Sequence, residues 1–183
     1  TVLCTHLHVD HVGWNTMLVD GAWVPTFPNA RYLLAENEWR YWDGVDDDPL
    51  NAGILDDSVR PVFEAGLVDL IGWEHQVCES VRLKPTPGHT PGHVSVLIES
   101  AGQTGLITGD CIHHPCQMTR TDWCSSADYD AEQGRSTRES LLAQYAEQPV
   151  LLIGTHFATP TAGWVRNRPD GGYWLDVGSL SGG

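Results

Sequence analysis

The chain has 183 residues, of which 41% are hydrophobic and 19% charged, and its formal net charge is −14. These values predict a single soluble, globular domain over residues 1–183 and exclude a disordered chain. No apolar run is long enough to span a bilayer, and ten Lys and Arg residues spread along the chain form no basic stripe. We therefore expect no membrane or nucleic-acid partner, and a cytoplasmic location.

The cysteines are odd in number and contain no Cys-x-x-Cys pair, which favours reduced thiols over a disulfide framework or a zinc ribbon. They are Cys4, Cys78, Cys111, Cys116 and Cys124.

Apolar runs and turn residues predict an alternation of strands and helices. In chain order, we expect strands at 1–5, 17–23 (with a turn) and 30–35, a helix at 36–42, a polar loop at 43–49, a helix at 54–64 and a short apolar segment at 68–70. Strands follow at 77–84, 94–99 and 105–108, then a helix at 135–147 and strands at 150–154 and 172–177.

Metal-type ligands follow the ends of several predicted strands. His6, His8, Asp10 and His11 lie within six positions directly after the first strand. Imidazole and carboxylate are the nitrogen and oxygen ligands that zinc and similar ions prefer. This cluster therefore predicts part of a metal site.

Three later segments carry the same kinds of side chain. His89 belongs to the run Thr-Pro-Gly-His-Thr-Pro-Gly-His at 86–93, while Asp110 and His156 each follow a predicted strand. Strand ends and loops on a rigid scaffold are where sites are usually built. The spacing predicts a metal site but leaves open which histidines share an ion.

The motif His-x-His-x-Asp-His, followed in order by His89, Thr-Gly-Asp110 and Gly-Thr-His156, resembles the metallo-β-lactamase-fold superfamily of binuclear metallohydrolases. The resemblance implies an α/β protein with an αβ/βα four-layer sandwich. In this family several strands precede the first motif, whereas only residues 2–5 precede it here. We therefore expect that the N-terminal strands are missing, because the chain is a fragment or because a partner supplies them.

The resemblance also implies the metal ligands and their chemistry. His6, His8 and His89 would bind one ion, Asp10, His11 and His156 would bind the second, and Asp110 would bridge both. Two divalent ions, with zinc favoured, would hold a bridging hydroxide that attacks an ester-like bond of a lactone, carboxylic ester or phosphotriester. Asp110 and Asp10 would be catalytic, the latter as a relay of a proton to the leaving group.

Within the superfamily, the 86–93 run is similar to that of N-acyl-homoserine lactonases and methyl-parathion-hydrolase-like enzymes. Residues 109–113 and Gln117 are closer to the second group, and the tyrosine that lactonases carry near the bridging aspartate has no counterpart before Tyr129. The alternatives are a β-lactamase, a glyoxalase-type thioesterase, or a non-catalytic metal-binding fragment. A small ester or lactone is the expected partner, and a homodimer is left open.

Further side chains near these motifs have two interpretations. We expect His93 to be structural or to support a ligand. His113 and His114 either belong to a loop at the pocket mouth, or His113 contacts substrate or orients Asp110. Trp14 and Trp123 either line the pocket or pack in the core.

Overall fold

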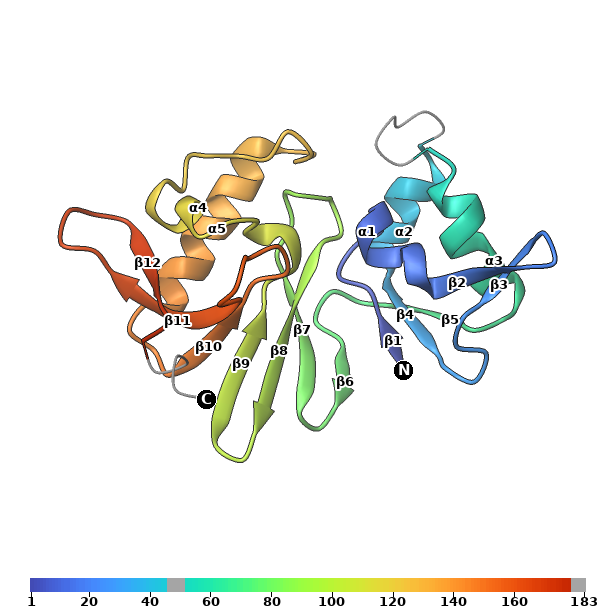
Figure 1. The fold of residues 1–183 in the computed structure, drawn as a ribbon, viewed down its shortest axis with the longest axis horizontal. Coiled ribbons are helices and arrows are strands. Elements are labelled where there is room, and N and C mark those ends of the chain that lie inside the picture. Colours follow the sequence, from blue (N-terminus) through green and yellow to red (C-terminus); the bar gives the residue numbers. More distant parts are fainter. Residues whose placement is uncertain (46–51, 179–183) are drawn as a thin grey trace. The chain divides into compact units, whose positions relative to one another are not determined.

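The computed structural model describes residues 1–45 and 52–178, so the expected loop at 43–49 lies outside the described residues from position 46 onward. This mixed α/β chain folds into two compact units, Thr1–Trp73 and Glu74–Gly183 (Figure 1). Within the described ranges, no helix combines the length and the apolar character needed to cross a bilayer.

The first unit is built on a parallel sheet of three strands in the order β1-β4-β5. The strands are β1 (Val2–Leu3), β4 (Tyr32–Ala35) and β5 (Val68–Ile71), accompanied by the hairpin of β2 (Thr16–Val19) and β3 (Ala22–Pro25) and by the helices α1 (Val9–Val12), α2 (Glu36–Asp43) and α3 (Arg60–Glu64). All four residues of β4 are buried, as expected for the central strand of a parallel sheet.

The helix expected at 54–64 is interrupted. A π-helical turn over Leu55–Val59 precedes α3, and Pro61 lies in the first turn of α3. Proline has no backbone N–H, so it is tolerated in the first turn of a helix but breaks the hydrogen-bond ladder of a helix interior. Val59, between the two segments, packs in the core of this unit with Leu7 and Leu34.

The second unit contains a seven-stranded sheet in the order β12-β11-β10-β9-β8-β7-β6. Its strands are β6 (Gln76–Cys78), β7 (Val81–Pro85), β8 (Val94–Ser100), β9 (Gln103–Ile107), β10 (Val150–Ile153), β11 (Ala162–Asn167) and β12 (Tyr173–Asp176), and its helices are α4 (Cys116–Thr119) and α5 (Ala131–Tyr145). β9 and β10 are parallel, and all other neighbours are antiparallel.

Two predictions for this sheet are wrong. The single strand expected at 77–84 is a hairpin, because β6 and β7 are separated by a turn at Glu79 and Ser80. β11 was not predicted at all. Its sequence contains Gly163, a residue that weakens the strand pattern, and here the glycine leaves room for the backbone and side chains of β12.

The helix α5 covers one face of this sheet (Figure 1). Leu97, Leu106 and Leu152 form a row across three neighbouring strands and are buried in one cluster with Leu141 and Leu142 of the helix. Alternate residues of a strand point to opposite faces, so this register directs one residue of each strand toward the helix.

The helix begins at Ala131, before the expected start at 135. The carboxylate of Asp130 accepts hydrogen bonds from the backbone N–H groups of Glu132 and Gln133. This capping interaction satisfies N–H groups that have no partner within the helix, and it explains the earlier start.

Strand direction brings three loops of the second unit to one edge of the sheet. β9 and β10 are parallel, so the loops that follow them, at Asp110 and His156, leave from the same edge. The loop between β7 and β8 lies there too, because β8 is antiparallel to β9 and its first residues pair with the end of β9. The topology therefore gathers His89, Asp110 and His156.

Candidate metal centre

In the first unit, three imidazoles lie together, two from the loop that follows β1 (His6 and His8) and one from α1 (His11). The ring of His6 lies 4.7 Å from the ring of His8 and 4.0 Å from that of His11, measured between centroids. The carboxylate of Asp10 lies 3.4 Å from Nε2 of His11. The four residues of the first motif are thus held on one short turn.

A buried carboxylate of the same unit supports this turn. Glu38 of α2 accepts hydrogen bonds from the backbone N–H of Leu7, at 3.0 Å, and from Nε1 of Trp42, at 2.7 Å. The indole of Trp42 also meets the ring of His8 edge-on at 5.4 Å. Glu38 therefore fixes the backbone between the first two histidines of the motif.

In the second unit, the loop at 86–93 is anchored on the start of α5. The carbonyl of Gly88 accepts from the N–H of Asp130, and the carbonyl of Pro87 accepts from the hydroxyl of Thr137 at 2.7 Å. Gly88 has a φ of +133°, and any Cβ at this position would collide with the backbone of Gly134. Only glycine allows this close approach, which places the neighbouring His89.

The carboxylate of Asp110 is surrounded by imidazole nitrogens of the same unit. Its Oδ2 atom lies 3.1 Å from Nε2 of His156, 3.2 Å from Nε2 of His113 and 3.5 Å from Nε2 of His89. Ligand-type atoms of His89, Asp110 and His113 all lie within 4.8 Å of one another. Imidazole nitrogen and carboxylate oxygen at such separations are a donor set suited to a divalent metal ion.

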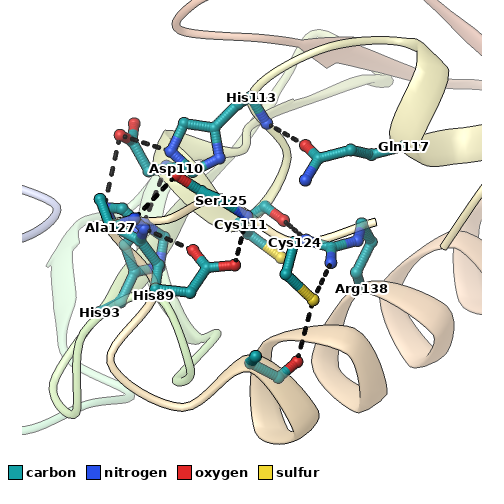
Figure 2. Close-up of polar contacts among 12 residues, drawn as sticks. His89, His93, Asp110, Cys111, His113, Gln117, Cys124, Ser125, Ala127 and Arg138 are labelled. Atoms are coloured by element: carbon teal, nitrogen blue, oxygen red, sulfur yellow. Dashed lines mark hydrogen bonds and ion pairs between the residues drawn. The ribbon is translucent and has the colours of Figure 1, made fainter. Parts of the chain in front are cut away.

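His93 has a structural role in this arrangement. Its Nε2 atom accepts a hydrogen bond from the backbone N–H of Asp110 at 2.9 Å (Figure 2). Its proton therefore lies on Nδ1, near the hydroxyl and the carbonyl of Thr86. Both ring nitrogens are thereby occupied by protein groups. His93 positions Asp110, in agreement with the expectation that it is not itself a ligand.

His89 has a carboxylate partner that the sequence did not reveal. Its Nδ1 atom lies 2.8 Å from Oδ1 of Asp128, whose other oxygen accepts from the N–H of Ser125. Burial raises the pKa of Asp128, but these two hydrogen bonds more than offset it and hold the pKa below its usual range. With the proton on Nδ1 beside this carboxylate, Nε2 of His89, which faces Oδ2 of Asp110, is the nitrogen suited to bind a metal ion.

The segment after Asp110 is tied to α5 by a buried arginine. Arg138 is 1% exposed, and it donates to the carbonyl of Cys111 at 2.9 Å (Figure 2). It also donates to the carbonyl of Trp123 at 2.9 Å and to that of Thr121 at 3.3 Å. Gln117 donates to the same carbonyl of Trp123. These interactions hold the loop that carries His113.

All five cysteines are free thiols. Burial raises the pKa of Cys4 to about 11 and that of Cys111 to about 12, so both stay protonated near neutral pH. Neither thiol is therefore a reactive thiolate at that pH.

The structure thus brings His6, His8, Asp10 and His11 together in the first unit, and His89, Asp110 and His156 together in the second. Sequence reasoning missed Glu38, Asp128 and Arg138. Glu38 and Arg138 are charged residues at buried positions of helices. The hydrophobic periodicity of those helices could have identified both as buried charges.

The family model of the metallo-beta-lactamase superfamily matches residues 1–163, so the chain belongs to this superfamily. An N-acyl homoserine lactonase of Bacillus cereus is 26% identical over 157 residues, which cover 84% of this chain and 54% of that protein. The chain spans about half the length, or less, of the curated relatives it matches.

Solved structures agree on the fold. The hydrolase AbOPH, described as a member of the beta lactamase superfamily, is 24% identical, with a TM-score of 0.79 over 95% of this chain and 62% of that one. AidC, described as a dizinc quorum-quenching lactonase, is 21% identical, with a TM-score of 0.75 over 95% of this chain and 63% of that one. The expected metallo-β-lactamase fold is thereby confirmed.

Proposed function

We propose that this chain binds a pair of divalent metal ions, with zinc favoured, and hydrolyses an ester-like bond, with a lactone as the favoured substrate class. The observation that carries the proposal is the carboxylate of Asp110, whose Oδ2 atom faces three imidazole nitrogens at 3.1 to 3.5 Å. The names of a curated relative and of the neighbour AidC support the substrate class.

The proposed ligands are those that the resemblance of the motifs to the superfamily implies. His6, His8 and His89 hold one ion, Asp10, His11 and His156 hold the second, and Asp110 is shared. When bound, such a pair lowers the pKa of coordinated water and polarises the carbonyl of the substrate. The shared carboxylate offsets the repulsion between two cations.

The protein's own residues prepare this site before any ion binds. Asp128 keeps the proton of His89 on Nδ1, and His93 holds the backbone N–H of Asp110, which orients the carboxylate. Asp10 of the first motif is the proposed proton relay to the leaving group. Groups that are already oriented need no costly rearrangement when the site is loaded.

Metal content and activity of the same sample test the proposal. We expect about two equivalents of zinc in the protein, lost on chelation together with hydrolysis of a lactone and restored by adding zinc. Near-zero metal uptake under loading conditions would contradict the proposed metalloenzyme. Metal binding without hydrolysis of any substrate would favour the non-catalytic metal-binding fragment. A parallel panel of a lactone, an aryl ester, a phosphotriester, a β-lactam and a thioester identifies the substrate class.

The variant Asp110→Ala tests the shared carboxylate. We expect it to bind fewer than two ions and to lose more than about 100-fold in activity. Removing a residue that only supports a metal ligand would lower activity by less than this. The control Asp122→Ala removes an exposed carboxylate paired with Arg120 and should keep both ions. Unchanged stoichiometry in Asp110→Ala would refute the bridging role.

A further inference from the structure

His113 lies against Asp110 but has no place in the proposed ligand set. Its Nε2 atom is 3.2 Å from Oδ2 of Asp110. Its ring is stacked on that of His156, with 5.6 Å between centroids and 17° between planes, and it meets the ring of His89 at 4.8 Å and 67°. His113 is therefore one of three imidazoles around the same carboxylate oxygen.

The other ring nitrogen separates His113 from a metal ligand. A histidine that binds a metal through one nitrogen almost always donates the proton of the other nitrogen to an acceptor. His89 meets this requirement through Asp128. Nδ1 of His113 is buried and has no hydrogen-bond partner in residues 1–45 and 52–178.

The lack of a partner at Nδ1 among the described residues indicates which nitrogen of the neutral His113 ring carries the proton. A proton on Nδ1 would be a buried donor without an acceptor, which costs about 1–3 kcal/mol. A proton on Nε2 lies near an acceptor, since Oδ2 of Asp110 is 3.2 Å from that nitrogen. The tautomer with the proton on Nε2 is therefore favoured. In that tautomer Nε2 has no lone pair with which to bind a metal ion.

The backbone at His113 is fixed by one side chain. Oε1 of Gln117 accepts from the backbone N–H of His113 at 2.7 Å (Figure 2), and from that of His114 at 3.3 Å. Gln117 is 5% exposed, and its amide donates to the carbonyl of Trp123, which Arg138 also contacts. The imidazole is thus held toward Asp110 by a connected set of hydrogen bonds.

We infer that His113 is a positioning residue that donates a hydrogen bond from Nε2 to the Asp110 carboxylate, and that it is not a metal ligand. The inference rests on the proposed function, because it assigns Asp110 the shared ligand role. A hydrogen bond to one oxygen limits rotation of the carboxylate, which has to present its oxygens in a set direction to bind two ions. Outer partners of this kind change metal affinity by about 10–100-fold.

A pair of substitutions tests the hydrogen bond. The amide of Gln carries an N–H close to where the Nε2–H of histidine lies, whereas Leu has no donor. We expect His113→Leu to bind zinc about 10–100-fold more weakly, and His113→Gln to bind within a few-fold of the original protein. His114→Leu is the matched control, since His114 is exposed and its Nδ1 accepts only from the N–H of Cys116 within the part of the chain that the structure describes.

Zinc affinity is measured on the full chain by competition with a chromophoric chelator, and lactone hydrolysis is measured on the loaded samples. Loss of one ion in both His113→Leu and His113→Gln would show that His113 is a ligand and would overturn the inference. Unchanged affinity in His113→Leu would overturn it as well. Failure of the original protein to bind two ions would instead contradict the proposed function, so the two failures are distinguishable.

Discussion

Nδ1 of His89 lies 2.8 Å from Oδ1 of Asp128, a residue 39 positions later in the chain. The hydrogen bond joins the loop between β7 and β8 to the segment that precedes α5. It sets the tautomer of His89, so Nε2 is directed toward Asp110 as an unprotonated nitrogen. A candidate metal ligand and its supporting carboxylate are thus part of one packed unit.

Replacing Asp128 by Ala should weaken zinc binding about 10–100-fold, because His89 would lose the partner that holds its proton on Nδ1. Chelator competition measures the effect. Asp130→Ala is the control, because Asp130 lies two positions away and caps α5. That variant should lose about 1 kcal/mol of stability and keep its zinc affinity. Equal zinc affinity in both variants would contradict the assigned role of Asp128.

Glu38 should be needed for the first motif as an acceptor, not as a charge. Glu38→Gln keeps an oxygen for the N–H of Leu7 and for the indole of Trp42, so we expect a change in unfolding free energy below about 1 kcal/mol. Glu38→Leu leaves two buried donors unsatisfied and should cost about 2–5 kcal/mol. Urea unfolding measures both, and a loss of equal size in the two variants would show that the charge matters instead.

Gly88→Ala should be strongly destabilising. The added Cβ meets the backbone of Gly134, and a φ of +133° is strained for any other residue. We expect a loss of about 2–5 kcal/mol from overpacking and strain together. Gly102→Ala is the matched control, because Gly102 also has a positive φ, +72°, but open space around it. Its loss should be about 1–2 kcal/mol, so the difference between the two variants measures the close approach.

Arg138→Met should cost about 2–5 kcal/mol, because it removes the buried donor of the carbonyls of Cys111 and Thr121 and one of the two donors of the carbonyl of Trp123. Arg138→Lys should not restore stability, since one ammonium group cannot reproduce the planar fork that reaches all of them. Arg135→Met on the same helix removes an exposed ion pair with Glu139 and should leave stability almost unchanged. A fully stable Arg138→Lys would contradict this explanation.

The strand ends and their ligand-type residues could be predicted from the sequence, because both signals are local. Alternating apolar residues mark a strand, and a histidine or aspartate directly after it is visible in the same few positions. His89, Asp110 and His156 were therefore predicted before the sheet was known. Their meeting at one edge depends on the parallel pairing of β9 with β10, which only the structure showed.

The supporting residues were decided by tertiary structure. Glu38 accepts from a backbone N–H 31 positions away, and Asp128 pairs with a ring 39 positions away. A local sequence pattern cannot predict contacts between residues so far apart in the chain. The strand β11 was missed for a related reason, since its pairing with β10 and β12 compensates for the weak strand preference of Gly163. The sequence by itself thus determined the ligand chemistry and the family, while the packing of distant segments determined which atoms hold each ligand in place.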